Sequence, residues 1–494
     1  MVPRDPRRRH AHHAGHAGQA GGEPMTKVLS VASECVPLMK TGGLADVVGA
    51  LPAALAGQGV EMRVLVPGYP KVMAALGKAK AVMTWDDLFG GPASLRAGKL
   101  GDGVLYTLDA PHLFDREGGP YNDATGADWP DNPQRFAALS LAGARVAAEG
   151  IKGWSPDVIH CHDWQAGLAP LYLREKGAGD RVASVITIHN IAFQGMAPGD
   201  MVGTLGLPPG EFTQDGYEFW GDISALKAGL VYADKITTVS PTYAAEIMTP
   251  DYGVGMDGLL QARQADVVGI LNGIDGEAWS PPFTKPSGKA KHRAALRREF
   301  DLPDWDGPVC VVVSRLTEQK GLDLLLMALP ALLDNGGQLV LLGTGEPGLE
   351  AAYRDFAAQH PGVAVTIGYD EDLAHRMIVG GDAILVPSRF EPCGLTQLYG
   401  LHHGTLPVVA LTGGLADTVI NASPAGLAAG AATGIQFNPV TAQALAQALM
   451  KLVNLYHDQP TWTQMMKNAM AAPVDWGHSA AKYAALYAGM VKAG

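Results

Sequence analysis

The chain has 494 residues, which is too many for one compact core and favours two or more domains. Hydrophobic residues make up 47% of it and charged residues 17%, as in ordinary soluble globular proteins. The formal net charge is −12, so no overall basic field exists to attract nucleic acid or an anionic membrane. An anionic ligand would therefore have to be held by local cations.

Residues 1–24 combine an arginine cluster with repeated His, Ala and Gly. No apolar segment follows the cluster, so we interpret this stretch as a disordered extension rather than a secretory signal, with a metal-binding histidine tract as the alternative. No apolar run reaches the length of a membrane span. The four cysteines (Cys35, Cys161, Cys310 and Cys393) lack paired spacing, which argues against a zinc site or disulfides and indicates the cytoplasm.

From residue 27 onward, short β-branched runs alternate with helical patterns. The expected buried strands lie at residues 27–33, 61–67, 104–108, 157–161, 183–189, 235–240 and 267–271. This alternation predicts a mainly parallel sheet with helices on both faces. The pattern stops at residues 272–308, which are rich in Pro, Gly and charge and are predicted to be a linker with a short basic helix.

A second alternating series follows the linker, with expected strands at residues 308–314, 338–345, 363–369, 383–388, 406–410 and 434–437. The sequence thus predicts two doubly wound α/β domains that face each other across a cleft, with ligands at the carboxyl ends of the strands. The expected boundaries are 25–275 for the first domain, 276–307 for the linker, 308–470 for the second domain and 471–494 for a C-terminal helix that packs back on the first domain.

The stretch "KTGGLADVVGALP" at residues 40–52 places two glycines between an expected strand and a helix that begins near Leu44. Gly42 and Gly43 would let the backbone approach a ligand, the helix N-terminus would offer free N–H groups, and Lys40 would add a positive charge. These features are typical of a phosphate or sugar site. A tight turn with a solvated lysine is the alternative.

In the second domain, Arg315 and Lys320 follow an expected strand, where two cations suit a diphosphate. A solvated loop is the alternative. Glu391 is expected at the opening of a helix, where it would be either a simple cap or a site carboxylate. The residues "CGLT" at 393–396 would add free N–H groups as a cradle for oxygen atoms.

Histidines cluster beyond strand ends in the first domain, at His160, His162 and His189, together with Asp163. Their spacing does not match a known metal motif, so we expect hydrogen bonds to a polar substrate, with buried structural histidines as the alternative. "GTGEPG" at 343–348, with Asp370 beyond it, also fits a dinucleotide pattern. The acidic triplets at 304–306 and 370–372 are interpreted as solvated turns.

Taken together, the ordered motifs resemble those of the bacterial glycogen synthases and plant starch synthases. The motifs are "KTGGLADVVGALP", "HDWQAGL", "HNIAFQG", "LNGID", "SRLTEQKGLDLL", "GTGEP" and "RFEPCGLTQLYGL", and the resemblance runs from about residue 27 to the end. It implies two facing Rossmann-like domains of the GT-B type, with the acceptor side in the first domain and the nucleotide donor side in the second. It also implies retaining glucosyl transfer from ADP-glucose to the non-reducing 4-hydroxyl of an α-1,4-glucan such as glycogen, without a metal or cofactor.

The resemblance assigns roles to residues. It implies that Lys40 contacts the sugar nucleotide beside Gly42 and Gly43, that Arg315 and Lys320 hold the diphosphate, that His189 lies beside the glucosyl ring, and that Glu391 is the essential carboxylate. The remaining donor-pocket positions implied are Asp163, Asn272, Cys393, Gly394, Leu395 and Thr396, with Gly345 in a loop on the nucleoside side.

Two positions depart from related patterns. Many two-domain retaining transferases carry a second glutamate where this chain has Tyr399, and some relatives carry histidine where it has Gln165. Three alternatives stay open at this point: a transferase that uses a UDP-sugar, an NAD-dependent dehydrogenase that uses "GTGEPG", and a catalytically silent glucan-binding protein.

Overall fold

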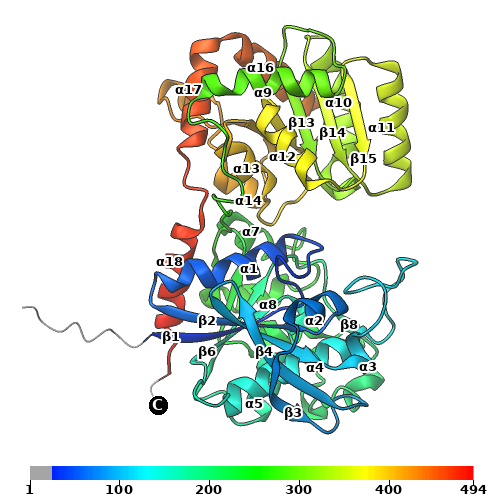
Figure 1. The fold of residues 1–494 in the computed structure, drawn as a ribbon, viewed down its shortest axis with the longest axis vertical. Coiled ribbons are helices and arrows are strands. Elements are labelled where there is room, and N and C mark those ends of the chain that lie inside the picture. Colours follow the sequence, from blue (N-terminus) through cyan, green and yellow to red (C-terminus); the bar gives the residue numbers. More distant parts are fainter. Residues whose placement is uncertain (1–24, 493–494) are drawn as a thin grey trace, which may run out of the picture.

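The computed structural model describes residues 25–492 and contains two lobes, one above the other in Figure 1. The expectation for residues 1–24 lies outside the described residues. Each lobe is built on its own sheet, the first from strands up to Gly269 and the second from strands beginning at Val309. The two doubly wound α/β units predicted from the sequence are therefore present, while the exact domain boundaries stay a prediction.

The first lobe contains a nine-stranded sheet in the order β12-β11-β7-β6-β1-β2-β5-β4-β3. The strands from β12 to β5 run parallel, and β4 and β3 complete the edge in antiparallel pairing. Their bounds are β1 (Thr26–Val31), β2 (Val60–Pro67), β3 (Lys80–Trp85), β4 (Ala93–Leu100), β5 (Gly103–Asp109), β6 (Val158–His162), β7 (Ala183–Ile188), β11 (Lys235–Thr238) and β12 (Val267–Gly269).

The antiparallel strands β3 and β4 were not predicted from the sequence. Strand β3 is mostly exposed and β4 is mostly half-buried, so they lack the continuous apolar runs that mark buried parallel strands. A small three-stranded sheet in the order β8-β10-β9 was missed as well, because its strands have only two or three residues each. They are β8 (Met196–Ala197), β9 (Glu218–Phe219) and β10 (Asp222–Ser224).

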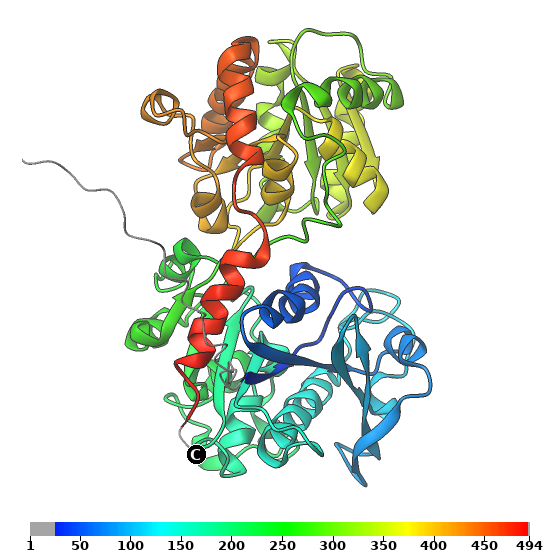
Figure 2. The same cartoon turned by 60° about the vertical axis from the view of Figure 1, so that its left-hand side comes forward.

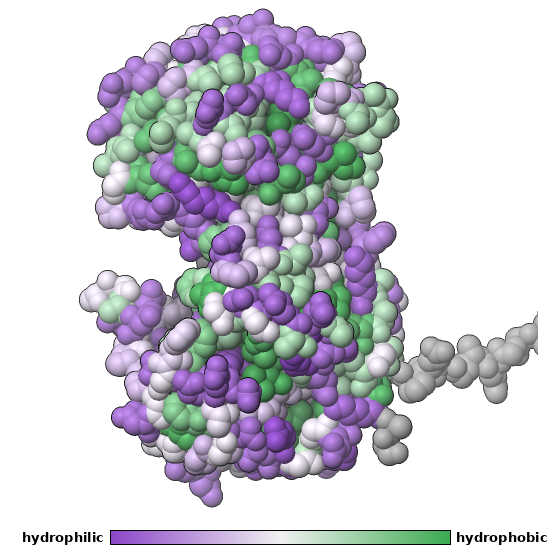
Figure 3. Space-filling view, turned by 180° about the vertical axis from the view of Figure 1, so that it is seen from behind, coloured by the Kyte–Doolittle hydropathy of each residue, from purple (hydrophilic) through white to green (hydrophobic). Residues whose placement is uncertain are grey.

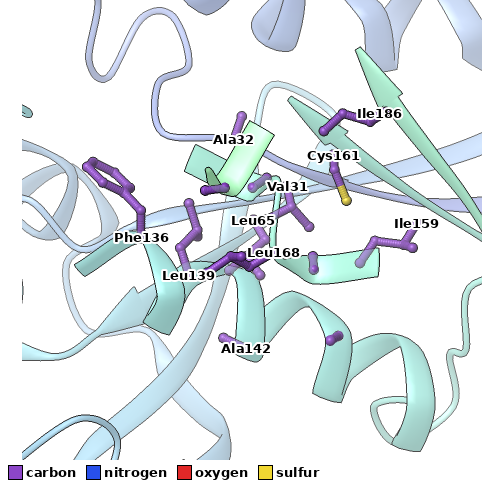
Figure 4. Packing of buried hydrophobic residues seen from close by; sticks show 14 of the residues in the cluster. Val31, Ala32, Leu65, Phe136, Leu139, Ala142, Ile159, Cys161, Leu168 and Ile186 are labelled. Atoms are coloured by element: carbon purple, nitrogen blue, oxygen red, sulfur yellow. The ribbon is translucent and has the colours of Figure 1, made fainter. Parts of the chain in front are cut away.

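Helices cover both faces of the large sheet. Successive side chains of a strand point to opposite faces, so strands with apolar residues on both faces are covered on both. On β1, Leu29 and Val31 pack in the cluster that contains α4, whereas Val28 packs in the cluster that contains α1 and α18. Figure 4 shows the α4 side, where Phe136 and Leu139 lie against the strands. The helices of this lobe are α1 (Gly43–Ala56), α2 (Pro70–Leu76), α3 (Pro111–Phe114), α4 (Asn132–Glu149), α5 (Ala169–Glu175), α6 (Ala225–Tyr232), α7 (Pro241–Glu246) and α8 (Asp257–Ala262), with 3₁₀ turns η1 (Trp164–Ala166), η2 (Gly199–Val202), η3 (Pro209–Glu211) and η4 (Gln264–Asp266).

The second lobe contains a six-stranded, all-parallel sheet in the order β15-β14-β13-β16-β17-β18. Its strands are β13 (Val309–Val313), β14 (Gln338–Gly343), β15 (Val363–Ile367), β16 (Ala383–Val386), β17 (Leu406–Ala410) and β18 (Ile435–Phe437). Its helical elements are η6 (Glu318–Lys320), α10 (Leu322–Leu333), α11 (Pro347–Gln359), α12 (Glu371–Gly380), α13 (Thr396–His402), α14 (Gly413–Thr418), α15 (Pro424–Ala428), α16 (Ala442–His457) and α17 (Gln459–Met470).

Two segments join the lobes. The linker carries the short turn η5 (Pro286–Gly288) and the basic helix α9 (Lys289–Glu299), and it contains no strand. The chain then returns after α17, and α18 (Trp476–Ala488) packs against α1 of the first lobe. Figure 2 shows this last segment running from the upper lobe down the side of the lower one. Within residues 25–492, no helix is both long and apolar enough to cross a bilayer.

The lobes also touch directly, where α7 of the first lobe meets α14 of the second. The Ser240 hydroxyl donates to the Pro392 carbonyl oxygen at 2.6 Å, and the Thr242 hydroxyl donates to Asp417 Oδ1 at 2.6 Å. These contacts lie on one side of the cleft and leave the other side open (Figure 3).

Candidate active site

A cavity of about 1200 Å³ lies between the lobes and is lined by residues from both. All of the site residues that the family resemblance implies, except Gly345, line it. They are Lys40, Gly42, Gly43, Asp163, His189, Asn272, Arg315, Lys320, Glu391, Cys393, Gly394, Leu395 and Thr396. The fold thus brings together residues that are more than 300 positions apart in the chain.

Gly345 is the exception, although its neighbours Gly343 and Thr344 line the cavity. A Cβ atom at Gly345 would lie 2.2 Å from the Leu316 carbonyl oxygen. The amide of Gly345 donates to Glu350 Oε1 at 2.9 Å. Close packing against the strand-following loop therefore explains this glycine without a ligand.

Glu391 and Lys320 form an ion pair in the second-lobe wall of the cavity. Lys320 Nζ lies 2.5 Å from Glu391 Oε2, and the Ser388 hydroxyl donates to the same oxygen at 2.9 Å. The Glu391 side chain is 9% exposed and that of Lys320 is 17% exposed. A pair this buried holds the carboxylate in one position.

The expectation that Glu391 opens a helix is wrong. Helix α13 begins at Thr396 and is preceded by Leu395 as its N-cap, so Glu391 lies in the loop between β16 and α13. The Glu391 carboxylate is paired with a lysine side chain instead of capping helix N–H groups. The simple-cap interpretation therefore does not hold.

A glycine brings the two partners together. Gly321 directly follows Lys320 and has a φ of 65°, in the left-handed region that favours glycine. A Cβ atom there would lie 2.0 Å from the Pro387 carbonyl oxygen. The loop that carries Lys320 can therefore sit against the end of β16, next to the loop that carries Glu391.

Arg315 lies on the same wall but is exposed. Among residues 25–492, its guanidinium has no carboxylate partner. Its planar fork of N–H donors is therefore available to an anion in the cavity.

The glycine loop forms the facing wall. Helix α1 begins at Gly43, with Gly42 as its N-cap and no side chain capping it. A Cβ atom at Gly42 would meet nothing within 4 Å, so the space above the helix N-terminus is open. Gly42 and Gly43 line the cavity, so this helix N-terminus lies beside open space, which suits an anion.

Lys40 is not simply solvated, because its Nζ lies 2.8 Å from Asp46 Oδ1. Burial raises the pKa of Asp46 despite the nearby lysine charge. For Lys40, burial would lower the pKa, but the hydrogen bond and charge of Asp46 outweigh it and raise the pKa above its ordinary value. With side chains 37% and 25% exposed, this pair is weakly stabilised and is available for exchange with a bound anion.

Glu34 and Tyr121 also line the cavity, and neither was predicted from the sequence. The buried Glu34 carboxylate accepts hydrogen bonds from the Thr41 backbone N–H, the Thr41 hydroxyl and the Tyr121 hydroxyl. Glu34 therefore holds the loop that carries Lys40. No local pattern could have indicated this, since Tyr121 comes 87 residues later in the chain.

Asp163 positions the backbone at His189. Asp163 has a φ of 53°, and its Oδ1 accepts hydrogen bonds from the His189 N–H at 2.7 Å and the Asn190 N–H at 3.4 Å. Burial raises the pKa of Asp163 to about 7, although these two hydrogen bonds oppose the rise. A carboxyl with this pKa changes its charge near neutral pH.

The histidines divide into two kinds. His160 and His162 are fully buried; His160 Nδ1 lies 2.7 Å from the Tyr487 hydroxyl and His162 Nε2 lies 3.0 Å from the Ser30 hydroxyl. The buried structural interpretation therefore fits both. His189 reaches the cavity, with its Nε2 3.0 Å from His162 Nδ1. Burial lowers the pKa of His189 to about 3, so its ring is neutral at physiological pH.

Tyr399, at the position of the second glutamate in wider relatives, lines the cavity and stacks on Trp279 of the linker. The ring centroids are 3.7 Å apart, and His375 stacks on the other face of Trp279 at 3.6 Å. The position thus has a packing role that joins the linker to the second lobe.

The remaining sequence patterns have structural explanations. Asp370 caps α12 by accepting from the Leu373 N–H, so it is engaged within its own lobe. In the described part of the chain, no group of His, Cys, Asp or Glu side chains is arranged to hold a metal ion.

Solved structures place this architecture in a class. The chain is similar to the catalytic domain of starch synthase IV from Arabidopsis thaliana bound to ADP and acarbose, with 29% identity, a TM-score of 0.83 and coverage of 95% of this chain and 100% of that one. A sucrose-phosphate synthase from Thermosynechococcus elongatus shares the fold at 18% identity and a TM-score of 0.57, over 94% of this chain and 98% of that one. The fold is therefore that of a two-domain GT-B glycosyltransferase.

Sequence relatives narrow the class to a family. Residues 27–262 match the model of the starch synthase catalytic domain, and residues 307–454 match glycosyl transferases group 1. The chain is 66% identical to the glycogen synthase of Paracoccus denitrificans (strain Pd 1222) over 94% of this chain and 100% of that protein. It is 59% identical to that of Jannaschia sp. (strain CCS1) over 94% and 99%. The chain belongs to the glycogen synthase family, a family of enzymes that transfer glucose.

Proposed function

We propose that this chain transfers glucose from ADP-glucose to the 4-hydroxyl at the non-reducing end of an α-1,4-glucan, with retention at the anomeric carbon. The observation that best supports this proposal is the buried Lys320–Glu391 pair, which faces the open N-terminus of α1 across the interlobe cavity. Such a cavity offers cations for a diphosphate on one wall and a carboxylate beside them for a sugar.

Arg315 and Lys320 would hold the leaving diphosphate. As the bond between the anomeric carbon and the phosphate oxygen breaks, negative charge grows on the departing ADP. The unpaired guanidinium of Arg315 and the ammonium of Lys320 lie on one wall, where they can stabilise that charge. Lys40 would add a third cation from the other lobe once it leaves Asp46.

Glu391 would act on the positive charge that grows on the sugar. Its Oε2 already binds Lys320 and Ser388, which fixes the carboxylate and leaves Oε1 for the substrate side. This double anchoring favours charge stabilisation and positioning over attack as a nucleophile. The leaving phosphate would then accept the proton of the acceptor hydroxyl.

His189 would contribute hydrogen bonds and no charge. Its low pKa keeps the ring neutral, and its Nε2 is engaged with His162. The Asp163 carboxylate fixes the backbone at this point, so the ring is held beside the sugar site. A neutral imidazole polarises a sugar hydroxyl without repelling the developing positive charge on the ring.

Closure of the lobes over the donor would exclude water, which otherwise competes with the glucan for the glucosyl group. The contacts between α7 and α14 and the two connecting segments would act as the hinge region. Small-angle scattering should show compaction when ADP is added, and an unchanged radius of gyration would contradict closure.

We also propose a cytoplasmic location. The support is that all four cysteines are free and buried, as expected of a protein kept in a reducing compartment. Labelling of unfolded protein with a thiol reagent directly after cell lysis should find all four thiols reduced.

The test is incorporation of labelled glucose into glycogen from ADP-glucose and, in parallel, from UDP-glucose. Wild type should use ADP-glucose, and Glu391→Ala should lose about 10²–10³-fold or more of the rate. Glu299→Ala is the matched control, because Glu299 is also ion-paired, with Arg376 at 2.7 Å, but lies on α9 outside the cavity.

Each other outcome has a meaning. A preference for UDP-glucose would keep the site but change the donor. Transfer from neither donor, with glycogen still bound, would favour the silent glucan-binding alternative. Binding of NAD in place of both nucleotide sugars would favour the dehydrogenase alternative.

A further inference from the structure

A patch of apolar side chains is exposed at the edge of the cavity in the first lobe. Its members are Phe193, Met196, Trp220 and Val254, with 58%, 43%, 85% and 48% of their surface exposed. Exposed apolar residues are ordinary when scattered, but a group beside a cleft marks a binding surface. We call these four residues the rim patch.

Trp220 lies at the tip of the hairpin formed by β9 and β10. Trp220 and Gly221 are the two loop residues, with φ values of 54° and 90°, as in a type I′ turn. Asn, Asp or Gly is preferred at the first of these positions, and a bulky side chain in this region is strained. A tryptophan is therefore a costly choice for the turn itself, which points to a use for its exposed ring.

Val254 repeats this feature next to the hairpin. It has a φ of 50°, again in the left-handed region that a β-branched residue avoids. A Cβ atom at the following Gly255 would lie 3.0 Å from Phe219 Cζ and 3.8 Å from Trp220 Nε1. Two strained apolar residues from separate segments thus meet at one place on the surface.

The rim patch is continuous with the cavity. Phe193, Gln194 and Met196 line the cavity, and Met196 begins β8, which pairs directly with β10 of the β9–β10 hairpin. Gln194 Nε2 donates to the Val254 carbonyl oxygen at 3.0 Å. This bond ties the segment that follows β7 to the segment that carries Val254.

The hairpin is held rigidly. The buried Lys227 donates to the carbonyl oxygens of Gln214 at 2.5 Å and Glu218 at 2.6 Å. Glu218 Oε1 in turn accepts from the Gly221 N–H at 2.6 Å. The aromatic ring at the tip is therefore presented on a fixed support, which lowers the ordering cost of binding.

We propose that the rim patch is a secondary binding site for the α-1,4-glucan acceptor, stacking sugar rings that lie beyond the reactive end. This inference rests on the proposed function above. A polymeric acceptor is longer than the cavity and must leave it across its rim. Aromatic rings suit the apolar faces of sugar rings, while carboxylates beside the patch accept hydrogen bonds from hydroxyl groups.

The charge of the region favours this occupant over others. The hairpin carries Glu218 and Asp222, and the chain as a whole has a net charge of −12. An anionic partner such as RNA or an acidic membrane would be repelled. A neutral polysaccharide is not.

The test uses Trp220→Asn, which keeps a residue that the turn prefers and so should not lower the melting temperature. The KM for glycogen should rise about tenfold, which corresponds to about 1.4 kcal/mol. The KM for the nucleotide sugar, and kcat with maltotriose as acceptor, should stay unchanged. Trp220→Tyr should retain most of the glycogen affinity because it keeps an aromatic face.

Met327→Ala is the matched control, since Met327 is 71% exposed on α10 and is not among the cavity-lining residues. Native gels that contain glycogen should retard the wild type and this control but not Trp220→Asn. An unchanged KM and mobility for Trp220→Asn would overturn the inference. So would a loss of self-association in that variant by light scattering, because the patch would then be an interface between copies of the chain.

The binding and transfer measurements separate the two proposals. Glycogen retardation that depends on Trp220, without transfer from any nucleotide sugar, would contradict the proposed function and keep the rim patch as a glucan site. Glucose transfer with no role for Trp220 would keep the proposed function and contradict the rim patch as a glucan site.

Discussion

The same six residues, Thr-Gly-Gly-Leu-Ala-Asp, occur at 41–46 and at 412–417. Both copies start a helix, α1 in the first lobe and α14 in the second, with the second residue of each copy at or next to the N-cap. The two copies nevertheless do different work. The first is a wall of the cavity, whereas the second joins the lobes.

A glutamate holds each copy, but from a different place. In the first copy, Glu34 of the same lobe accepts from the Thr41 N–H and hydroxyl. In the second copy, Glu246 of the other lobe accepts from the Thr412 hydroxyl at 2.8 Å and the Gly413 N–H at 3.0 Å. The second copy is thereby a contact across the lobes.

The glycines differ even more. A Cβ atom at Gly42 would meet nothing within 4 Å, but one at Gly413 would lie 2.0 Å from the Glu391 carbonyl oxygen. Gly414 is as tightly packed, with a Cβ position 2.2 Å from the Cys393 carbonyl oxygen. The second copy thus supports the loop that carries Glu391, while the first leaves room for a ligand. Identical local sequence supplies the turn, and the surroundings decide its use.

The largest effect is expected at Lys320, the cation that pairs with Glu391. Lys320→Ala should lower kcat about 10²–10³-fold, because it removes a charge that stabilises the leaving group and leaves Glu391 unpaired. Initial rates of glucose incorporation measure this. Lys291→Ala, an exposed lysine on α9, is the control and should behave as wild type. Equal rates for the two variants would contradict the assignment.

Alanine substitutions in the two copies should have opposite consequences. Gly413→Ala should destabilise the protein by about 2–4 kcal/mol, since Gly413 has a φ of 42° and no space for a Cβ atom. Gly42→Ala should leave stability unchanged, because its backbone is extended and its surroundings are open. It should instead raise the KM for the donor. Thermal unfolding and donor kinetics distinguish them, and similar melting temperatures would remove the distinction.

A third test concerns the buried carboxyl on the first-lobe wall. Burial raises the pKa of Asp163 from 3.8 to about 7, so between these values the folded protein holds a proton that the unfolded chain releases. Wild-type stability should therefore fall as pH rises from about 4 to 7, by an amount that corresponds to about 4 kcal/mol at most. Asp163→Asn keeps a hydrogen-bond acceptor but cannot ionise.

Asp163→Asn should consequently be more stable than wild type at pH 8, by about 4 kcal/mol at most, and no more stable near pH 4. Melting temperatures of both proteins across this range measure the difference. A constant difference at all pH values would show that the carboxyl does not titrate there.

The smallest effect is expected at Lys40, which directly precedes the first copy. Lys40→Ala should raise the donor KM about tenfold, or about 1.4 kcal/mol, and change kcat little, because Lys40 is exposed and must first leave Asp46. Added salt should weaken donor binding more in wild type than in this variant. A kcat loss as large as that of Lys320→Ala would contradict the expectation that Lys40 contributes less than Lys320.

Some features of the molecule follow from local pattern. Continuous apolar runs such as residues 309–313 mark buried parallel strands because both faces of such a strand are covered. The strands β3, β4 and β8–β10 were missed, because exposed or very short strands have no such run. The placement of Glu391 at a helix start was wrong for a related reason, since helix ends depend on contacts beyond the local segment.

The chemistry-bearing residues, the linker and the two α/β units could be found along the chain, because charge, glycine and apolar periodicity are properties of neighbouring residues. The partners of those residues could not. Glu34 with Tyr121, Asp163 with His189, and Lys320 with Glu391 are pairs separated by 26 or more positions, joined only when strands from distant segments meet at one sheet edge. The same holds for the two copies of Thr-Gly-Gly-Leu-Ala-Asp, whose different roles arise from the space and the glutamate that folding places around each.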